Sequence, residues 1–213
     1  MRPILYSFRR CPYAMRARMG LRLAGQLCEL REVVLRDKPA EMIEASPKAT
    51  VPVLVLPDGE VVDESFDIMM WALKQHDPEN WLAPEEGALA DMIELIERCE
   101  AEFKPHLDRY KYTNRYEEVD PTIHRREAEK FLTVLETRLV RSAFLFGSRK
   151  TLADFAIAPF IRQFANTDKA WFDASPYPRL QAWLDDFLSS GTFTSVMAKY
   201  PQWRPGDEPV MFP

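Results

Sequence analysis

The chain has 213 residues, of which 46% are hydrophobic and 29% are charged, and its formal net charge is −5 at pH 7. This composition is that of a globular protein that can bury a core without disulfide staples. A negative net charge without basic runs argues against nucleic acid as the main partner, since neutralising phosphates requires clustered Lys and Arg. No stretch approaches the roughly 20 apolar residues of a membrane span, so no membrane partner is expected either.

The chain contains three cysteines, an odd number with no paired spacing. Such a count argues against a disulfide framework. The first residues run directly into a strand-like segment and lack the apolar core and cleavage site of a secretory signal. We therefore expect a cytoplasmic protein in a reducing compartment, where a cysteine is either buried or catalytic. We expect no metal site.

Residues 1–76 alternate between strand and helix patterns. Apolar residues recur at helical spacing after position 11 and again after position 65, with apolar strand-like runs between them. In chain order, the expected elements are a strand at 4–8, a helix from 11 to about 24, a strand at 28–35, a short helix from 39 to about 45, strands at 51–56 and 60–62, and a helix from 65 to about 76. This β-α-β-α-β-β-α order predicts an α/β domain of thioredoxin-like type.

The rest of the chain shows no comparable strand pattern. Residues 77–87 carry Pro78, Pro84 and an acidic pair, which is typical of a linker. Residues 88–213 are expected to form an all-helical bundle domain. Its predicted helices are one with an apolar stripe from Leu89 to Leu107, one through residues 128–139, one beginning at Thr151, and one from Pro178 to about Ser190.

Cys11 lies between the first strand and the first helix, directly before Pro12. A thiol at this position is close to the positive end of the helix dipole and to unpaired backbone N–H groups, which favour the thiolate and lower its pKa. Pro12 fits the first helical turn, because the N–H that it lacks would have no partner there. A single cysteine is more often a buried apolar residue than a nucleophile. That structural interpretation holds for Cys28 and Cys99, whereas its placement makes Cys11 the candidate nucleophile.

Position 14 is alanine, so the Cys-X-X-Cys motif that closes an internal disulfide is absent. The Cys11 thiolate would therefore form a mixed disulfide with a small thiol and be released by a second one. Such chemistry requires a binding site for the small thiol.

Three further features add to this pattern. Val51-Pro52 begins a strand, and an X-Pro bond there is compatible with a cis conformation. Ser65 follows Glu64 at the start of a helix, where a serine can act as the N-cap. Thr151 and Asp154 precede an apolar run in a capping-box pattern.

Together with Cys11-Pro12-Tyr13-Ala14, these features resemble the cytosolic glutathione transferase family over essentially the whole chain, and the cysteine segment is similar to that of the omega class and its bacterial relatives. Tyr13 stands where the omega segment commonly has phenylalanine. The resemblance implies that glutathione is the co-substrate and that the protein is a homodimer. It also implies a glutathione site formed by Tyr13, Lys38, Val51, Pro52, Glu64 and Ser65.

In this family the binding site for the second substrate is lined by the helical domain. Aromatic side chains are the candidates for such an apolar wall, although aromatic residues at helical spacing are usually part of a core. The candidates are Tyr110, Tyr112, Tyr116, Trp171 and Trp203.

We expect a glutathione-dependent thiol transferase that reduces mixed disulfides or dehydroascorbate through Cys11. One alternative is the conjugation of glutathione to electrophiles, for which Cys11 would tend to trap the bound thiol as a disulfide. Another is a non-catalytic interaction protein on the same fold, since a fold alone does not fix function. The partner in either enzymatic case is a small-molecule or protein disulfide or electrophile.

Overall fold

The computed structural model describes residues 2–117 and 120–213, which form two compact units. Unit 1 contains Met1–Glu79 together with Ser190–Pro213, and unit 2 contains Asn80–Ser189. The boundaries differ from those expected at 1–76, 77–87 and 88–213. The predicted linker is divided at residue 79, and residues 190–213 join unit 1 instead of the helical unit.

Unit 1 is built on a five-stranded sheet with the strand order β4-β3-β1-β2-β5. The strands are β1 (Ile4–Ser7), β2 (Cys28–Glu32), β3 (Val53–Val55), β4 (Val61–Val62) and β5 (Met211–Phe212). The central strand β1 runs parallel to β2 and antiparallel to β3, with Leu5 opposite both Leu30 and Leu54. All three leucines are almost completely buried, as expected for the middle of a covered sheet.

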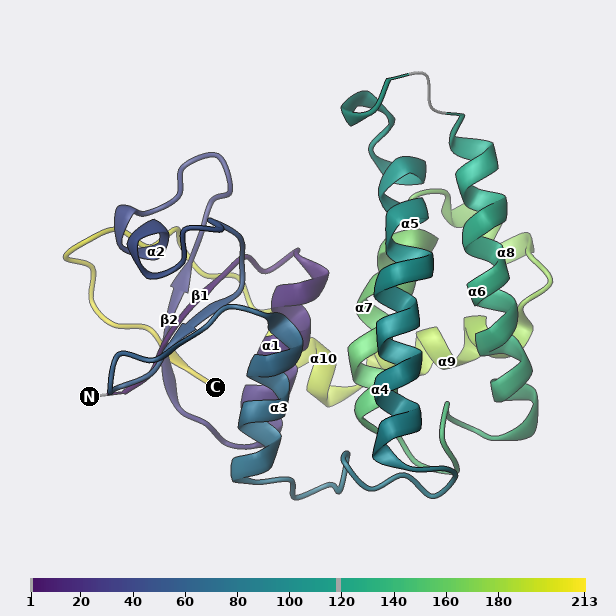
Figure 1. Ribbon diagram of the computed structural model, residues 1–213, viewed down its shortest axis with the longest axis horizontal. Coiled ribbons are helices and arrows are strands. Elements are labelled where there is room, and N and C mark those ends of the chain that lie inside the picture. The colour runs from purple at the N-terminus through teal and green to yellow at the C-terminus, as the bar shows by residue number, and fades with distance from the viewer. Residues whose placement is uncertain (1, 118–119) are drawn as a thin grey trace. The chain divides into compact units, whose positions relative to one another are not determined.

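Three helices complete the predicted β-α-β-α-β-β-α order: α1 (Pro12–Leu23), α2 (Ala40–Ala45) and α3 (Ser65–Gln75). In Figure 1, α1 and α3 lie together on one side of the sheet and α2 lies on the other. The close approach of α1 and α3 depends on Gly20, because a Cβ atom there would lie 2.9 Å from the Cα atom of Met69. The thioredoxin-like fold of this part of the chain is thus confirmed.

Residues 190–213 return to unit 1, which the sequence did not predict. The short helix α10 (Gly191–Val196) packs on α1, and β5 pairs antiparallel with β2. The backbone N–H of Leu30 donates to the carbonyl of Val210 at 2.7 Å. A strand of two residues has no periodicity to detect, and its position is set by the unpaired edge of β2.

Unit 2 is all helical, as predicted, and its helices are α4 (Leu89–Arg98), α5 (Lys104–Lys111), α6 (Pro121–Arg141), α7 (Leu152–Ala165), α8 (Lys169–Ala174) and α9 (Pro178–Ser189). The helix expected from Leu89 to Leu107 is interrupted by a π-helical segment, η1 (Cys99–Phe103). Pro105 follows this segment, and its missing N–H cannot continue the α-helical ladder. Within residues 2–117 and 120–213, no helix is long and apolar enough to cross a membrane.

The core of unit 2 is organised around α7. Thr151 is its N-cap, and a capping box joins Thr151 to Asp154, as the sequence predicted. The completely buried Asp154 carboxylate also accepts from the backbone N–H of Leu145 at 3.1 Å and from the indole of Trp183 at 2.8 Å. Burial raises the pKa of Asp154, and these hydrogen bonds oppose the rise. The box therefore ties three segments of unit 2 together.

Candidate functional site

Cys11 is the N-cap residue of α1. Its backbone is extended (φ −75°, ψ 125°), its N–H donates to the carbonyl of Phe8 at 2.9 Å, and its own carbonyl accepts from Met15 at 2.9 Å. Pro12 occupies the first helical turn, as predicted. The thiol is therefore held where the helix dipole and the unpaired N–H groups of the first turn stabilise negative charge.

The Cys11 thiol lies next to the loop that leads into β3. Its Sγ atom donates a weak hydrogen bond to the carbonyl of Val51 at 3.7 Å. The bond between Val51 and Pro52 is cis, and both residues are buried. The structure thus brings together two of the residues that the sequence singled out, although β3 itself begins two residues later than expected.

An apolar cluster borders the thiol. It consists of the buried residues Tyr6, Val33, Met42, Val51 and Val53. Cys11 and Trp203 are among the partly buried residues that pack against this cluster. One flank of Cys11 is therefore apolar, and its side chain remains partly exposed.

Glu64 and Ser65 lie at the start of α3. Glu64 is the N-cap residue and Ser65 is the first helical residue, so the cap expected at Ser65 falls one residue earlier. The buried Ser65 hydroxyl accepts from the guanidinium of Arg16 at 3.4 Å. Because Arg16 belongs to α1, this contact joins the N-terminal halves of α1 and α3.

Lys48 forms ion pairs with Asp63 and Glu64, the two acidic residues directly before Ser65. Its ammonium lies 2.7 Å from Glu64 and 3.0 Å from Asp63, and Asp63 also accepts from the Ser46 hydroxyl at 2.7 Å. Hydrogen bonds to Glu64 and Asp63 raise the pKa of Lys48. Hydrogen bonds from the Ser46 hydroxyl, and to a smaller extent from Lys48, lower the pKa of Asp63. Sequence reasoning did not predict this arrangement, because single surface lysines are common.

The other two predicted glutathione-site residues also belong to unit 1. Tyr13 is partly exposed in the first turn of α1, and the Arg16 guanidinium lies 5.8 Å from its ring. Lys38 is partly buried in the loop that precedes α2.

The two remaining cysteines are enclosed. Cys28 and Cys99 have no exposed surface, and burial raises the pKa of the Cys28 thiol to about 12. None of the three cysteines, all of which fall in the described part of the chain, forms a disulfide. The packing role predicted for Cys28 and Cys99 agrees with their burial, and Cys11 is the thiol that solvent reaches.

The five aromatic candidates for an acceptor site fall into different units. Tyr110 is 8% exposed and packs on Phe164, and burial raises its pKa. In the same unit, the Tyr112 hydroxyl accepts from Gln163 at 3.0 Å, the Tyr116 ring faces Arg109, and the Trp171 ring faces Arg125. Trp203 belongs to unit 1, where the Arg31 guanidinium lies 4.1 Å from its ring. Tyr110 is thus part of the core of unit 2, while Tyr112 and Trp203 keep exposed surface.

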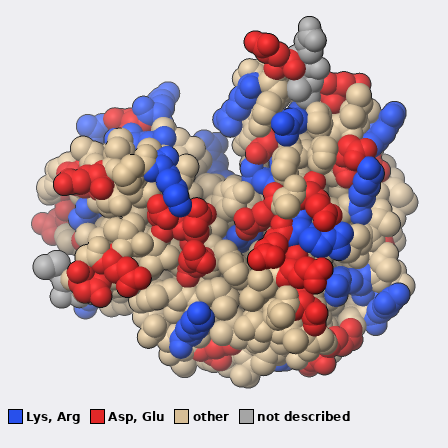
Figure 2. All heavy atoms as spheres, in the orientation of Figure 1, with Lys and Arg blue, Asp and Glu red and all other residues tan. Residues whose placement is uncertain are grey.

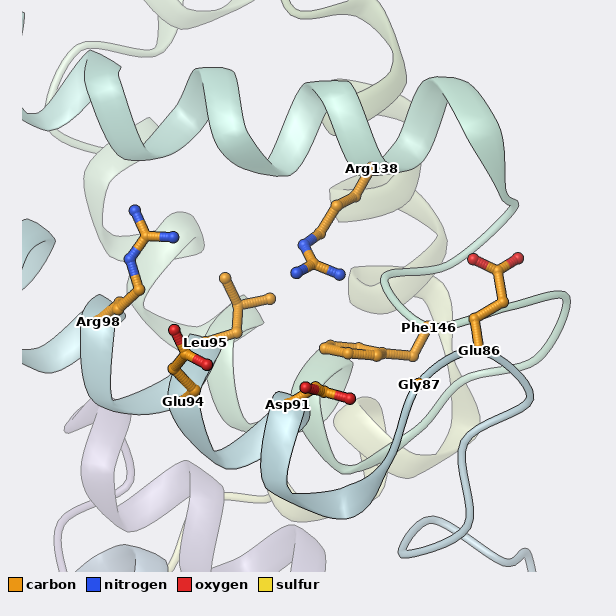
Figure 3. A pocket seen from close by; sticks show the side chains of 8 residues that line it. All are labelled: Glu86, Gly87, Asp91, Glu94, Leu95, Arg98, Arg138 and Phe146. Carbon is orange, nitrogen blue, oxygen red and sulfur yellow. The ribbon is translucent and has the colours of Figure 1, made fainter.

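Besides a pocket of about 370 Å³ along α6, unit 2 has a pocket between α4 and α6 (Figure 3). It has a volume of about 190 Å³, below the range of pockets that enclose drug-sized ligands. Its lining is strongly charged, with Asp91, Glu94 and Arg98 on α4 and Arg138 on α6, whose guanidinium lies 4.7 Å from the centre of the Phe146 ring. Figure 2 shows acidic and basic side chains interspersed on the visible face of each unit. The pocket does not involve the residues around Cys11.

A thioredoxin-like sheet, a cysteine at the N-cap of its first helix, a cis-proline beside that cysteine and a separate all-helical unit together have the fold of a glutathione transferase. The sequence pattern of the glutathione S-transferase N-terminal domain matches residues 5–81, and that of the C-terminal domain matches residues 81–186. The chain belongs to the glutathione S-transferase family.

The chain is similar to two kinds of curated relative. It is 27% identical to glutathione S-transferase omega-1 of Rattus norvegicus over 94% of this chain and 87% of the relative. It is 28% identical to a probable maleylacetoacetate isomerase of Caenorhabditis elegans over 83% of this chain and 84% of the relative.

Solved structures share the fold. A glutathione transferase family member from Pseudomonas fluorescens pf-5, crystallised with two glutathione molecules bound, superposes with a TM-score of 0.77 at 21% identity, covering 92% of each chain. The glutathione transferase URE2P6 from Phanerochaete chrysosporium, in complex with oxidized glutathione, gives 0.78 at 18% identity, covering 92% of this chain and 94% of that one.

Proposed function

We propose that the protein is a glutathione-dependent thiol transferase of omega type, which reduces mixed disulfides or dehydroascorbate through Cys11. The observation that carries this proposal is a partly exposed thiol at a helix N-terminus, with alanine at position 14 and the other two cysteines buried. A thiolate with these surroundings is a nucleophile, and Ala14 stands where a resolving cysteine would be in a Cys-X-X-Cys motif.

For a glutathionyl mixed disulfide, the reaction takes two exchanges. The Cys11 thiolate attacks the glutathionyl sulfur, so that a Cys11–glutathione disulfide forms and the other thiol leaves as a thiolate, which takes up a proton. A second glutathione, as its thiolate, then attacks the glutathionyl sulfur of that disulfide. Oxidised glutathione leaves and the Cys11 thiolate is regenerated, so atoms and electrons balance.

In this proposal glutathione is the co-substrate and is held by unit 1. The backbone of Val51, next to Pro52, pairs with its cysteinyl part, Glu64 meets its ammonium, and Ser65 at the start of α3 binds its γ-glutamyl carboxylate. Lys38 meets the glycyl carboxylate, and Tyr13 borders the thiol. Structural neighbours crystallised with glutathione and with oxidized glutathione support glutathione as the co-substrate.

The second substrate has fewer candidate contacts. Tyr112 and Trp203 are the aromatic residues that we propose for its binding, because they keep exposed surface, whereas Tyr110 would act through packing. We also propose a cytoplasmic homodimer. Light scattering of the purified protein tests the dimer, and a mass of one chain would contradict it.

Mass spectrometry after incubation with oxidised glutathione tests the reaction. We expect one glutathione adduct, located on Cys11, and none on the Cys11→Ser variant. Cys99→Ser is the control, because its thiol is buried and lies outside the proposed site. A glutathione adduct that still forms on the Cys11→Ser variant would contradict the proposal.

The same variant separates the alternatives. If conjugation is the main activity, Cys11→Ser should gain rate with an electrophile, because serine cannot trap bound glutathione as a disulfide. Isomerisation is a further candidate, because the identity to the maleylacetoacetate isomerase relative is as high as to omega-1. A protein that neither binds glutathione-agarose nor forms the adduct would instead be a non-catalytic family member.

A further inference from the structure

Helix α1 buries two arginines, Arg16 and Arg18, both without exposed surface. Arg18 makes the more extensive contacts. Its guanidinium is paired with the carboxylate of Glu32 at the end of β2, and its Nε donates to the Ser7 hydroxyl at 2.8 Å. One terminal nitrogen also donates to the carbonyl of Val196 at 3.2 Å. Arg18 thus joins α1 to β1, β2 and α10.

The second carboxylate oxygen of Glu32 points to the turn that carries Cys11. It accepts from the backbone N–H of Arg9 at 2.7 Å. Arg9 lies inside the turn that the bond from the Cys11 N–H to the Phe8 carbonyl closes. The turn is therefore attached to the end of β2 through a side chain, and the attachment lies two residues before the thiol.

A buried ion pair contributes little net stability, because removing both charges from water costs free energy that their attraction only partly offsets. Burial lowers the pKa of Arg18, and Glu32 opposes this effect. Replacing such a pair with well-packed apolar side chains is often neutral or stabilising, so the pair itself does not explain the stability of unit 1. What an apolar side chain cannot supply is an acceptor for the Arg9 N–H at a fixed place.

We propose that Glu32 is a positioning residue for Cys11: its carboxylate, oriented by Arg18, holds the turn from Phe8 to Cys11 so that the thiol stays at the N-terminus of α1. The consequence for catalysis rests on the proposed thiol transfer. Residues 190–213 take part in this arrangement, because the N–H of Trp203 donates to the Glu32 carbonyl at 2.9 Å and Val196 accepts from Arg18.

Two double variants isolate the contact to Arg9. Arg18→Met/Glu32→Gln and Arg18→Met/Glu32→Met both remove the buried charges and both leave Ser7 and Val196 without the arginine. The difference that bears on the turn is that glutamine keeps an oxygen that can accept from the Arg9 N–H, and methionine does not; the amide NH2 that glutamine also brings cannot replace this acceptor. Glu29→Gln is the control on the same strand, because the Glu29 carboxylate binds Arg31 and lies apart from the turn.

The first measurement is the rate of Cys11 alkylation by iodoacetamide as a function of pH. We expect the midpoint of this titration to lie about half to one pH unit higher with methionine than with glutamine at position 32, because a loosened turn weakens the interaction of the thiolate with the helix N-terminus. The second is thiol transfer, where we expect kcat to fall roughly tenfold between the two variants while KM for glutathione stays the same.

Midpoints that agree within experimental error would overturn the proposal. If the methionine variant does not fold, Glu32→Asp serves instead, because it keeps the charge and shortens the reach to both Arg9 and Arg18, and it should raise the midpoint of the alkylation titration. Alkylation requires no glutathione. A wild-type protein that forms no glutathione adduct would therefore contradict the proposed function, while the titration would still decide the role of Glu32.

Discussion

The Cys11 thiol faces the carbonyl oxygen of Val51 across 3.7 Å. This contact places the nucleophile beside the backbone that we propose to pair with the cysteinyl part of glutathione. A glutathionyl group joined to Cys11 would thus lie along residues 51–52, so in this proposal the sulfur and the backbone that binds its glutathionyl group belong to one site.

Cys11→Ser should lower thiol transfer by at least about a hundredfold, because the hydroxyl oxygen cannot form the mixed disulfide. The initial rate with a glutathionylated peptide and reduced glutathione measures this loss. Cys99→Ser is preferred to Cys28→Ser as the control, because Cys28 lies on β2 in the same unit as Cys11, whereas Cys99 lies in unit 2. A Cys11→Ser variant with more than a tenth of the wild-type rate would contradict the role of the thiol.

Lys48→Met should lower the KM for glutathione by about twofold to fivefold, because the lysine competes with the substrate ammonium for the exposed Glu64 carboxylate and surface ion pairs are weak. The effect should shrink at high salt, where the competing pair is already screened. Lys74→Met, an exposed lysine at the other end of α3, is the control. A higher KM for glutathione in the Lys48 variant would show instead that the ammonium of Lys48 helps to bind the substrate.

Ala49→Gly should stabilise the protein by about 0.5 kcal/mol, raising the melting temperature by roughly 1–2 °C. Ala49 has a φ of 52°, in the left-handed region that a Cβ atom disfavours, whereas glycine adopts it freely. Thermal unfolding measures the change. Asn80→Gly is the matched control, because Asn80 has a φ of 55° but asparagine tolerates this region, so its gain should be smaller.

Asp154→Ala should destabilise unit 2 by about 3 kcal/mol or more, because several buried donors, among them the Leu145 N–H and the Trp183 indole, lose their acceptor. Asp91→Ala provides the comparison: it removes a similar backbone bond at the exposed start of α4 and should cost about 1 kcal/mol. Denaturant unfolding gives both values. Equal losses would show that burial of the Asp154 network adds nothing.

Stability should decrease in mildly acidic solution through His106. Its ring nitrogen lies 2.8 Å from that of His124, and burial, followed by the charge of His124, lowers its pKa below the usual 6.5. A folded-state pKa below the unfolded one means that the unfolded chain takes up a proton first. The contribution of His106 to the free energy of unfolding is therefore complete above about pH 6.5. It is lost as the pH falls through the lower pKa that His106 has in the folded state.

His106→Gln should consequently flatten the melting temperature between pH 7 and pH 5, recovering roughly 2 °C of the drop seen in the wild type. The charged neighbours of this pair are Arg109 on α5 and Glu127 and Lys130 on α6. His76→Gln, at an exposed position, should leave the slope unchanged. An identical slope for His106→Gln and the wild type would remove the histidine pair as its cause.

The elements of residues 1–76 could be predicted because each carries its own signal. Residues 4–8 and 51–56 are largely apolar and of strand length, residues 28–35 contain Leu30, Val33 and Val34, and Pro12 marks a helix start. Cys11 could be found for the same reason, because the dipole argument depends only on its position in the chain. Thr151 and Asp154 likewise form a local motif.

The missing parts depend on tertiary contacts. Arg16 and Arg18 belong to a residue type that is almost always exposed, so nothing in the sequence of α1 shows that they are buried. The same holds for β5, since Met211 and Phe212 form a strand only because β2 offers them an edge. Lys48 and Glu32 are ordinary charged residues whose partners lie far along the chain.

The pairing of β2 with β5 has a consequence for synthesis on the ribosome. Glu29 and its partner Met211 are separated by the whole of unit 2. At about 5–20 residues per second, Met211 is added roughly 10 to 40 seconds after Glu29. During this interval β2 remains an unpaired edge of the nascent sheet. Arg18 then lacks its hydrogen bond to the Val196 carbonyl, and the Glu32 carbonyl lacks its hydrogen bond from Trp203. The helical unit, although translated second, can therefore be the first to complete its fold.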